Sequence, residues 1–400
     1  MSPSERPRIN REVAALPPSG IREFFDLVTT VENVISLGVG EPDFPTPWHV
    51  CDEVYDSLRR GFTSYTSNLG LIELRREISG HLCRLYGVEY NPDNEIIVTV
   101  GVSEGLDLTL RTILSPGDEV IIPDPCFVAY GPCVKLAGGV PVPAPMREED
   151  AFKLRPEVVR SRLTNRTRAL LIGFPNNPTG SVMTREELLP LAQIAEEHDL
   201  LVISDEIYDR LTYAGTHTCF ASLPGMWGRT VLLNGFSKSY AMTGWRIGYA
   251  CAPADIINSM MCVHSYTMMS APTPAQVAAI EAIRRGEPDI ERMKGEYDQR
   301  RRLLVKGLRD IGLSCFEPLG AFYVFPSVKS TGLTSDAFAR QLLETEQVAA
   351  VPGSAFGQAG EGYLRATYAT SMANLREALV RLERFVPSLE RQSRARNGQP

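Results

Sequence analysis

The 400-residue chain lacks the patterns that mark several common protein classes. Its eight cysteines include no C-x-x-C pair, and its five histidines show no H-E-x-x-H or other metal-binding spacing. We therefore expect no metal site, and we interpret the cysteines as small buried side chains in a reducing compartment. Acidic residues outnumber basic ones by 48 to 41, which gives a net charge of −7. Such a surface argues against nucleic acid or an anionic membrane as the main partner.

No segment of the sequence predicts membrane insertion or export. The first ten residues contain no apolar core of a signal peptide. Residues 256–280 carry no charge, but Asn258, His264, Gln276 and two prolines interrupt them. We expect a buried helix and loop there instead of a membrane span. Together with the cysteine usage, these features predict a cytoplasmic protein.

The middle of the chain alternates short apolar runs with longer amphipathic segments. The runs that predict strands are 95–100, 119–123, 169–174, 200–204, 230–236 and 247–252. Segment 184–198 predicts a helix, with Thr184 as N-cap and Glu187 three residues later. This alternation is typical of an α/β fold with a mostly parallel sheet, in which active sites lie beyond the carboxyl ends of the strands.

The last third of the chain has a different pattern. A long charged helix is expected over 287–311, followed by strand, helix, strand and helix patterns in turn. A chain of 400 residues also exceeds one ordinary core, so two domains are expected. We predict a large α/β domain of residues 48–286 and a smaller α+β domain that combines residues 287–400 with an N-terminal arm, 1–47.

Segment 230–249, TVLLNGFSKSYAMTGWRIGY, is the most informative. Its apolar strand ends at a small polar turn that carries Lys238, and Arg246 follows eight residues later. A lysine just beyond a buried strand and near a second cation has a lowered pKa, which makes it a nucleophile able to form a Schiff base. The arginine can hold a phosphate through its planar fork of donors. The pair therefore suggests a lysine bound to the aldehyde of a phosphorylated cofactor, for which pyridoxal 5'-phosphate is the usual example.

Polar residues follow the neighbouring strands at the same predicted edge. Segment 101–105, GVSEG, opens a helix, where free N–H groups and the helix dipole favour a phosphate. Asn177 lies in the turn after the third strand and can direct an amide at a ligand oxygen. Asp205 and Tyr208 follow the fourth strand. The aspartate could hold a pyridine nitrogen protonated, and the tyrosine could bond a phenolic oxygen.

The same region also allows a serine-hydrolase interpretation. Segment 101–105 matches the G-x-S-x-G nucleophile elbow, with Ser103 as nucleophile, Asp205 as acid and His217 or His264 as base. Few predicted strands precede Ser103, and no HGG-type oxyanion loop lies upstream. The lysine and arginine described above would also have no role, so this interpretation is disfavoured.

Taken together, these segments resemble the class I and II pyridoxal-phosphate-dependent aminotransferases of fold type I. The resemblance covers residues 35–382 and rests on ISLGVGEPDFPTP, FTSYTSNLG, SPGDEVIIPDPCFVAY, FPNNPTG, SDEIYDRLTY, NGFSKSYAMTGWRIGY, GAFYVFPS and VPGSAFG. Within the family, the chain looks like the bacterial subgroup that includes aspartate, aromatic and N-acetyl-diaminopimelate aminotransferases. The resemblance implies that residues 48–286 form the domain that binds pyridoxal phosphate.

The resemblance also implies roles by position. Lys238 would form the Schiff base, and Asp205 would pair with the pyridinium nitrogen. Asn177 and Tyr208 would bond the phenolate oxygen, and Phe127 would stack on the ring. The implied phosphate ligands are the backbone of Val102 and Ser103 together with Arg246 and, from the neighbouring subunit, Tyr65.

Two further implications concern the assembly and one departure from the family pattern. Because Tyr65 would bind the phosphate in the neighbouring subunit, the resemblance implies a homodimer with two shared active sites. Many members of the family carry a phosphate-binding serine where this chain has Gly235, and Ser237 is expected to replace it.

The implied substrates are amino acids and 2-oxo acids. Arg365 would clamp the α-carboxylate, helped by the backbone of Gly40 and by Asn177. The expected reaction moves an amino group from an L-amino acid to a 2-oxo acid by a ping-pong mechanism, with Lys238 transferring the Cα proton. A cysteine-S-conjugate β-lyase of the same fold is the alternative, because the two activities share nearly all of these residues. The amino donor stays open among aspartate, aromatic, aliphatic and acylated diaminopimelate side chains.

Overall fold

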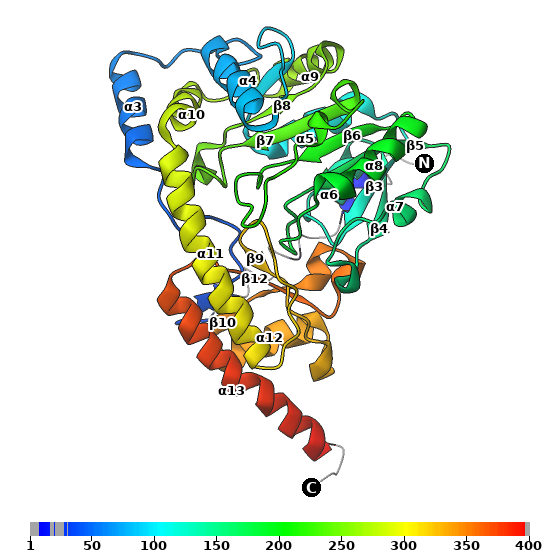
Figure 1. The fold of residues 1–400 in the computed structure, drawn as a ribbon, viewed down its shortest axis with the longest axis vertical. Helices are drawn as coiled ribbons and strands as arrows, with labels where there is room; N and C mark the ends of the chain where they lie inside the picture. The colour runs from blue at the N-terminus through cyan, green and yellow to red at the C-terminus, as the bar shows by residue number, and fades with distance from the viewer. Residues whose placement is uncertain (1–7, 17–19, 21–27, 30, 397–400) are drawn as a thin grey trace.

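The computed structural model describes residues 8–16, 20, 28–29 and 31–396 (Figure 1). A large sheet covered by helices forms the upper part of Figure 1, and smaller sheets with further helices form the lower part. The strands of the large sheet are β2 (Ile96–Thr99), β3 (Glu119–Asp124), β4 (Val140–Pro145), β5 (Thr167–Gly173), β6 (Leu201–Asp205), β7 (Thr230–Gly235) and β8 (Gly248–Cys251). Their spatial order is β2-β8-β7-β6-β5-β3-β4, and only β8 runs antiparallel to its neighbours.

All six predicted strands are present in this sheet, each with ends within two residues of the expected ones. Their apolar runs form strands because both faces of the sheet are covered, as parallel sheets require. Side chains alternate between the two faces: Ile203 and Leu233 pack in one hydrophobic cluster, while Val202 and Leu232 pack in the clusters on the other side. The predicted α/β class with a mostly parallel sheet is confirmed.

Strand β4 was not predicted, because its sequence VPVPAP contains three prolines. The prolines alternate with residues whose N–H groups face β3. Val140 N donates to Asp118 O at 2.8 Å, and Met146 N donates to Asp124 O at 2.7 Å. The prolines therefore occupy the positions whose N–H groups would point away from β3, and an edge strand needs no hydrogen-bond donor on that side.

The helices of the large part cover both faces of the sheet. They are α3 (Trp48–Arg59), α4 (Ile72–Tyr86), α5 (Gly101–Ile113), α6 (Tyr130–Leu136), α7 (Pro156–Arg160), α8 (Arg185–Glu197), α9 (Ala254–Thr267) and α10 (Thr273–Arg285). The predicted capping box of α8 is present, with Thr184 and Glu187 bonding in both directions. Segment 256–280 forms parts of two helices, α9 and α10, and not the single helix and loop that we expected. Within the described residues, no helix combines the length and apolarity needed to span a membrane.

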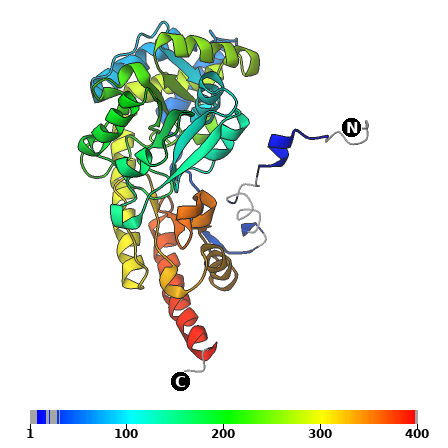
Figure 2. The ribbon, with the colours of Figure 1, turned by 90° about the vertical axis from the view of Figure 1, so that its right-hand side faces the viewer.

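The lower part contains α11 (Glu287–Asp310), α12 (Ser335–Glu346), α13 (Met372–Arg396) and short strands. Helices α11 and α13 lie side by side (Figure 2). Strands β11 (Val351–Pro352), β12 (Leu364–Thr367) and β9 (Tyr323–Val324) form an antiparallel sheet. Strand β1 (Ile35–Ser36) pairs with β10 (Val348–Ala349), so the N-terminal segment joins the C-terminal part. The short helix α1 (Arg11–Ala14) lies at the periphery (Figure 2). The division at residues 47 and 287 stays a proposal, which the pairing of β1 with β10 supports.

Candidate active site

A cavity of about 390 Å³ lies at the carboxyl ends of β5, β6 and β7, where the two parts of the chain meet. It is lined from four directions: the segment after β1, the start of α5, the turns after the central strands, and strands β9 and β12. The sequence-predicted residues that line it are Gly40, Val102, Ser103, Phe127, Asn177, Asp205, Tyr208, Ser237, Lys238, Arg246 and Arg365. The fold thus gathers every predicted site residue but Tyr65 around one space.

Lys238 lies in the turn just after β7, with its amine inside the cavity. Its Nζ donates a hydrogen bond to the carbonyl of Gly40 at 2.7 Å. Burial lowers the pKa of Lys238 to about 8, and the nearby Arg365 and Arg246 act in the same direction, whereas Glu41 opposes the shift. The amine is therefore largely available as a nucleophile or base in mildly alkaline solution, as the sequence suggested.

Asp205 ends β6 and faces the same cavity. Tyr130 donates its hydroxyl to Asp205 Oδ2 at 2.8 Å, and the Ile207 N–H reaches Oδ1 at 3.3 Å. Burial raises the pKa of Asp205 to about 6, and these two donors limit the rise. Sequence reasoning missed Tyr130, although it stands three residues after Phe127 in the quoted motif and its ring packs edge-on to Phe127 at 5.7 Å.

The start of α5 and Arg246 together form a cradle for an anion. Gly101 opens the helix with φ +75°, and a Cβ there would lie 2.8 Å from Arg246 Nη2. Val102 and Ser103 follow in the first turn, where helical N–H groups have no intrahelical partner. Free N–H groups, the helix dipole and a guanidinium at one place suit a phosphate.

The departure at Gly235 has a steric cause. A Cβ at this position would lie 2.9 Å from the Cα of Gly248 on the adjacent strand β8, so no serine fits. Ser237, two residues later, lines the cavity instead. Its position is consistent with the expected replacement.

Arg365 on β12 is almost fully buried, with 3% of its surface exposed. Its Nη1 donates to Asn177 Oδ1 at 3.1 Å and its Nη2 to the carbonyl of Gly38 at 2.6 Å. The rings of Tyr323 and Phe356 lie 4.6 and 4.7 Å from its Cζ. Its Nε has no partner, and no carboxylate pairs with the guanidinium among the residues described. A buried cation without a counter-ion is a strong site for a ligand carboxylate.

Tyr323 connects this arginine to Tyr208. Its hydroxyl lies 2.8 Å from the hydroxyl of Tyr208, and its ring is packed under Arg365. A Cβ on Gly40 would approach the Tyr323 hydroxyl to 2.6 Å, so glycine is required there. Sequence reasoning used the segment GAFYVFPS as a strand pattern and as a family motif, but gave no role to Tyr323.

The serine-hydrolase constellation is not assembled. His264 Nδ1 lies 2.7 Å from Glu104 Oε1, and His217 Nε2 lies 2.7 Å from Glu206 Oε2. Across the part of the chain that the structure describes, no hydrogen bond joins Ser103 to either histidine. Tyr65 is 80% exposed and lies outside the cavity, so its predicted role across a dimer stays a prediction.

Comparison with known proteins decides the family. The family model "Aminotransferase class I and II" matches residues 32–382. The chain belongs to the class I and II aminotransferase family. It is an enzyme, a transaminase of fold type I, and its cofactor is pyridoxal phosphate.

Relatives in this family match along nearly the whole chain. The Bacillus subtilis (strain 168) protein YugH is 53% identical over 94% of this chain and 97% of its own length. The aspartate aminotransferase of Pyrococcus abyssi is 46% identical over 92% of this chain and 96% of its own. The solved aromatic aminotransferase of Pyrococcus horikoshii OT3 matches with a TM-score of 0.89 and 45% identity, over 92% and 99% of the two chains.

The cavity residues fit pyridoxal phosphate. Its aldehyde needs an amine of low pKa, its phosphate an anion cradle, and its ring nitrogen an acid. Lys238, the start of α5 with Arg246, and Asp205 offer these three groups around one space. The orphaned Nε of Arg365 leaves the substrate carboxylate as a further partner.

We predict that Lys238 of the cofactor-free protein titrates near pH 8 and not near the ordinary 10.5. Since only the free amine reacts, labelling by trinitrobenzenesulfonate should rise with a midpoint near that pH, measured by mass spectrometry of the Lys238 peptide. Glu41→Gln should move the midpoint lower, because the Glu41 carboxylate stabilises the ammonium form. The exposed Lys135 in the same digest is a surface reference. A Lys238 midpoint near 10.5 would contradict this effect of burial.

Proposed function

We propose that this transaminase moves the amino group of an L-amino acid to a 2-oxo acid by a ping-pong mechanism in the cavity around Lys238. The observation that carries the proposal is the buried guanidinium of Arg365, which has two of its nitrogens fixed and faces a space shared with a lysine of lowered pKa. Amino acids and 2-oxo acids share the α-carboxylate that such a guanidinium binds. Both half-reactions can therefore use one binding site.

Each part of the cofactor has matching residues in the cavity. The proposed contacts are Val102, Ser103, Ser237 and Arg246 for the phosphate, Asp205 for the ring nitrogen, Asn177 and Tyr208 for the phenolic oxygen, Phe127 for the ring face and Lys238 for the aldehyde. When bound, pyridoxal phosphate supplies the carbonyl that receives the amino group and the ring that takes up the electron pair left at Cα.

The chain's own residues perform binding and proton transfer. Arg365 fixes the substrate carboxylate, with Tyr323 and Phe356 holding its guanidinium plane between them. Lys238 then takes the Cα proton, since an amine with a pKa of about 8 is a suitable general base near neutral pH. Tyr130 keeps the Asp205 carboxylate oriented toward the cavity through its 2.8 Å hydrogen bond.

We also propose a homodimer with shared active sites. Trp48 and Tyr55 of α3, Tyr65 and Tyr266 at the end of α9 are each more than 60% exposed, which is unusual for large apolar side chains. The hydroxyl of Thr273 donates to the Ser64 carbonyl at 2.7 Å, so the loop that carries Tyr65 lies against the start of α10. A second copy of the chain would cover these side chains.

A cytoplasmic location is part of the same proposal. All eight cysteines are unpaired. Free cysteines in this number are typical of proteins from reducing compartments.

Replacing Lys238 by alanine should abolish turnover, because no other amine lines the cavity among the described residues. We expect a loss of at least about 10²–10⁴-fold in the half-reaction rate, the usual contribution of a general acid–base group. Stopped-flow absorbance of the bound cofactor measures it, with each of the twenty amino acids tested singly. Lys135→Ala, a change at an exposed lysine, is the control. A Lys238→Ala enzyme with wild-type turnover would refute the assignment.

The same screen identifies the amino donor and separates the lyase alternative. A transaminase half-reaction stops after one turnover until a 2-oxo acid is added. Sustained release of ammonia and pyruvate without an added 2-oxo acid would favour the β-lyase instead.

Arg365→Ala should weaken the binding of every substrate that carries an α-carboxylate. A lost partner of a buried charged pair costs about 2–5 kcal/mol, so kcat/KM should fall at least about thirtyfold for each donor. Primary amines without a carboxylate are matched controls, and their slow rates should not change. Loss for one amino acid only would contradict a clamp on the common carboxylate.

Mixing two inactive variants tests whether Tyr65 acts across the dimer. If it does, a hybrid of one Lys238→Ala subunit and one Tyr65→Ala subunit contains one intact site, and activity should return after the two are denatured and refolded together. If Tyr65 acts within its own subunit, no hybrid site is intact and mixing restores nothing. Sedimentation of the mixture confirms that dimers have formed.

A further inference from the structure

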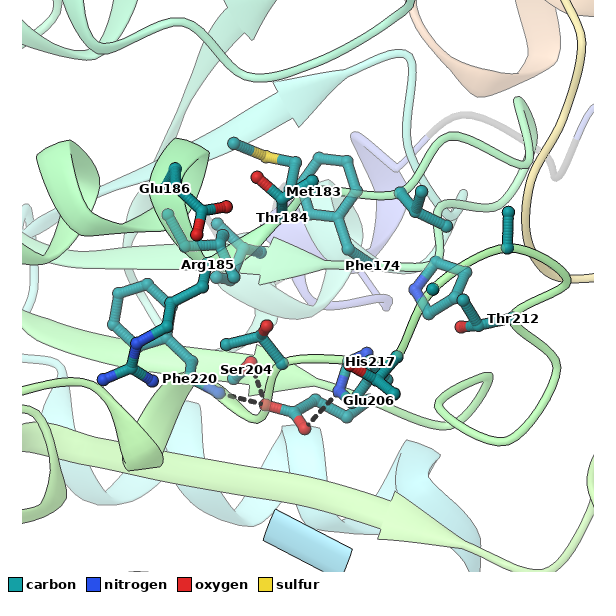
Figure 3. Close-up of a pocket in the computed structure, with 18 residues that line it drawn as sticks. Phe174, Met183, Thr184, Arg185, Glu186, Ser204, Glu206, Thr212, His217 and Phe220 are labelled. Atoms are coloured by element: carbon teal, nitrogen blue, oxygen red, sulfur yellow. Dashed lines mark hydrogen bonds and ion pairs between the residues drawn. The ribbon is translucent and has the colours of Figure 1, made fainter.

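Figure 3 shows the residues that line a second cavity, of about 410 Å³. It lies on the opposite face of strands β5 and β6 from the catalytic one. Side-chain alternation along the strands separates the two spaces. Asp205 lines the catalytic cavity, whereas Ser204 and Glu206 line the second one. Pro175 lines both. The proposed aminotransfer chemistry uses nothing in this second cavity.

The floor of the second cavity is apolar. It is formed by Ile172 and Phe174 of the strand β5 region, Leu188 of α8, and Phe220. All four side chains belong to the hydrophobic core or lie at its edge. A ligand in this space would therefore place an apolar body against the floor.

One wall of the cavity carries a buried polar network around Glu206 (Figure 3). Glu206 Oε1 accepts hydrogen bonds from the Ser204 hydroxyl at 2.8 Å and from the Phe220 N–H at 2.9 Å. Its Oε2 lies 2.7 Å from His217 Nε2. The side chains of His217 and Glu206 are only 9% and 2% exposed. Both oxygens of the Glu206 carboxylate are thus already engaged.

His217, by contrast, keeps one unused polar atom. Nε2 is turned to Glu206, and Nδ1 on the other side of the ring has no hydrogen-bond partner in the described chain. Burial alone would lower the pKa of His217, but the Glu206 carboxylate outweighs it, so the pKa is raised. In the doubly protonated ring both nitrogens donate, and Nδ1 is then a charged donor without an acceptor in the described chain.

The mouth of the cavity offers a second donor. Arg185, the first residue of α8, is exposed, and its guanidinium pairs with no carboxylate among the residues the structure describes. Glu186 also lines the cavity, but its carboxylate is bonded by its own N–H and by Thr184, which lower its pKa, and the charge of Arg185 acts in the same direction. Both carboxylates of the cavity are therefore supplied with donors, and the unused capacity belongs to His217 and Arg185.

We propose that this second cavity binds a small monocarboxylate with an apolar body. The carboxylate would accept from His217 Nδ1 and be attracted by the cation of Arg185 at the mouth, and the apolar body would cover the floor of Ile172, Phe174 and Phe220. Free amino acids and 2-oxo acids with apolar side chains both have this chemistry. An occupant would touch Pro175, which lines both cavities, and Glu206, whose neighbour Asp205 lines the catalytic one, so its binding acts on β6 from the face opposite Asp205.

Isothermal titration calorimetry of the holoenzyme with 3-phenylpropionate tests the proposal. The probe carries the carboxylate and an apolar body but has no amino or oxo group to react. We expect two molecules per subunit, one at Arg365 and one in the second cavity. In Arg365→Ala one site should remain. The uncharged 3-phenylpropionamide should bind the second cavity about tenfold or more weakly, because a charge-assisted acceptor is lost.

Variants assign the remaining site to the second cavity. His217→Gln keeps an amide nitrogen in place of Nε2, and with it the bond to Glu206, but removes the Nδ1 donor. In the Arg365→Ala background it should weaken the probe about tenfold or more, and Arg185→Gln should weaken it in the same direction. Arg162→Gln, at an exposed arginine outside the cavity, is the matched control. A single site per subunit that disappears in Arg365→Ala, or a second site that His217→Gln leaves unchanged, would overturn the proposal.

Titrations with L-leucine and with 4-methyl-2-oxopentanoate distinguish the two natural sources of the chemistry. Both are run on the Lys238→Ala, Arg365→Ala enzyme, in which the catalytic chemistry is removed. Whichever binds and loses affinity in His217→Gln is the class of occupant; failure of both to bind would restrict the cavity to carboxylates without an α-substituent. Because the readout is binding, the result stands apart from the test of aminotransfer itself.

Discussion

Positive charge held at one cavity, above all the buried guanidinium of Arg365, is the constraint on which the candidate site depends. Lys238, Arg246 and Arg365 line one space, and the carboxylates that face them there are Glu41 and Asp205. Asp205 accepts a hydrogen bond from Tyr130 and Glu41 accepts one from Thr243, and neither carboxylate pairs with the guanidinium of Arg365. A protein tolerates such an excess only where the surrounding structure holds the cations rigidly and a ligand completes them. The sheet, the start of α5 and strand β12 supply that rigidity from separate directions.

Successive side chains of a strand point to opposite faces of the sheet, so the end of β6 contributes residues to two different cavities. On β6, Asp205 points to one face and its neighbours Ser204 and Glu206 to the other. Asp205 is therefore held by contacts on both faces of the sheet. On one face Tyr130 donates to its carboxylate, and on the other the next residue, Glu206, accepts from the Phe220 N–H. The backbone beside Asp205 is consequently positioned by contacts on the opposite face of the sheet.

Sequence reasoning predicted what depends on local pattern. Apolar runs gave the buried strands, and the polar residues at their ends came together because parallel strands finish at one edge. The roles of these residues came from chemistry together with family resemblance. Tyr130 and Tyr323 were missed because their partners lie 75 and 115 residues away in sequence, and no periodicity joins them. The unpartnered Nδ1 of His217 could not be predicted from the sequence either. It can be recognised only once the structure shows that the other ring nitrogen, Nε2, is bonded to Glu206.

The prolines of β4 have a consequence beyond the ladder they permit. As the last strand of the sheet, β4 turns one side of its backbone away from β3. On that side the positions that would offer N–H groups are Pro141, Pro143 and Pro145, which have none. A free sheet edge normally invites another chain to add a strand and start aggregation. Because these positions of the free edge of β4 offer no N–H donors, another strand cannot pair with it in a regular ladder, and the sheet can end there without recruiting further copies.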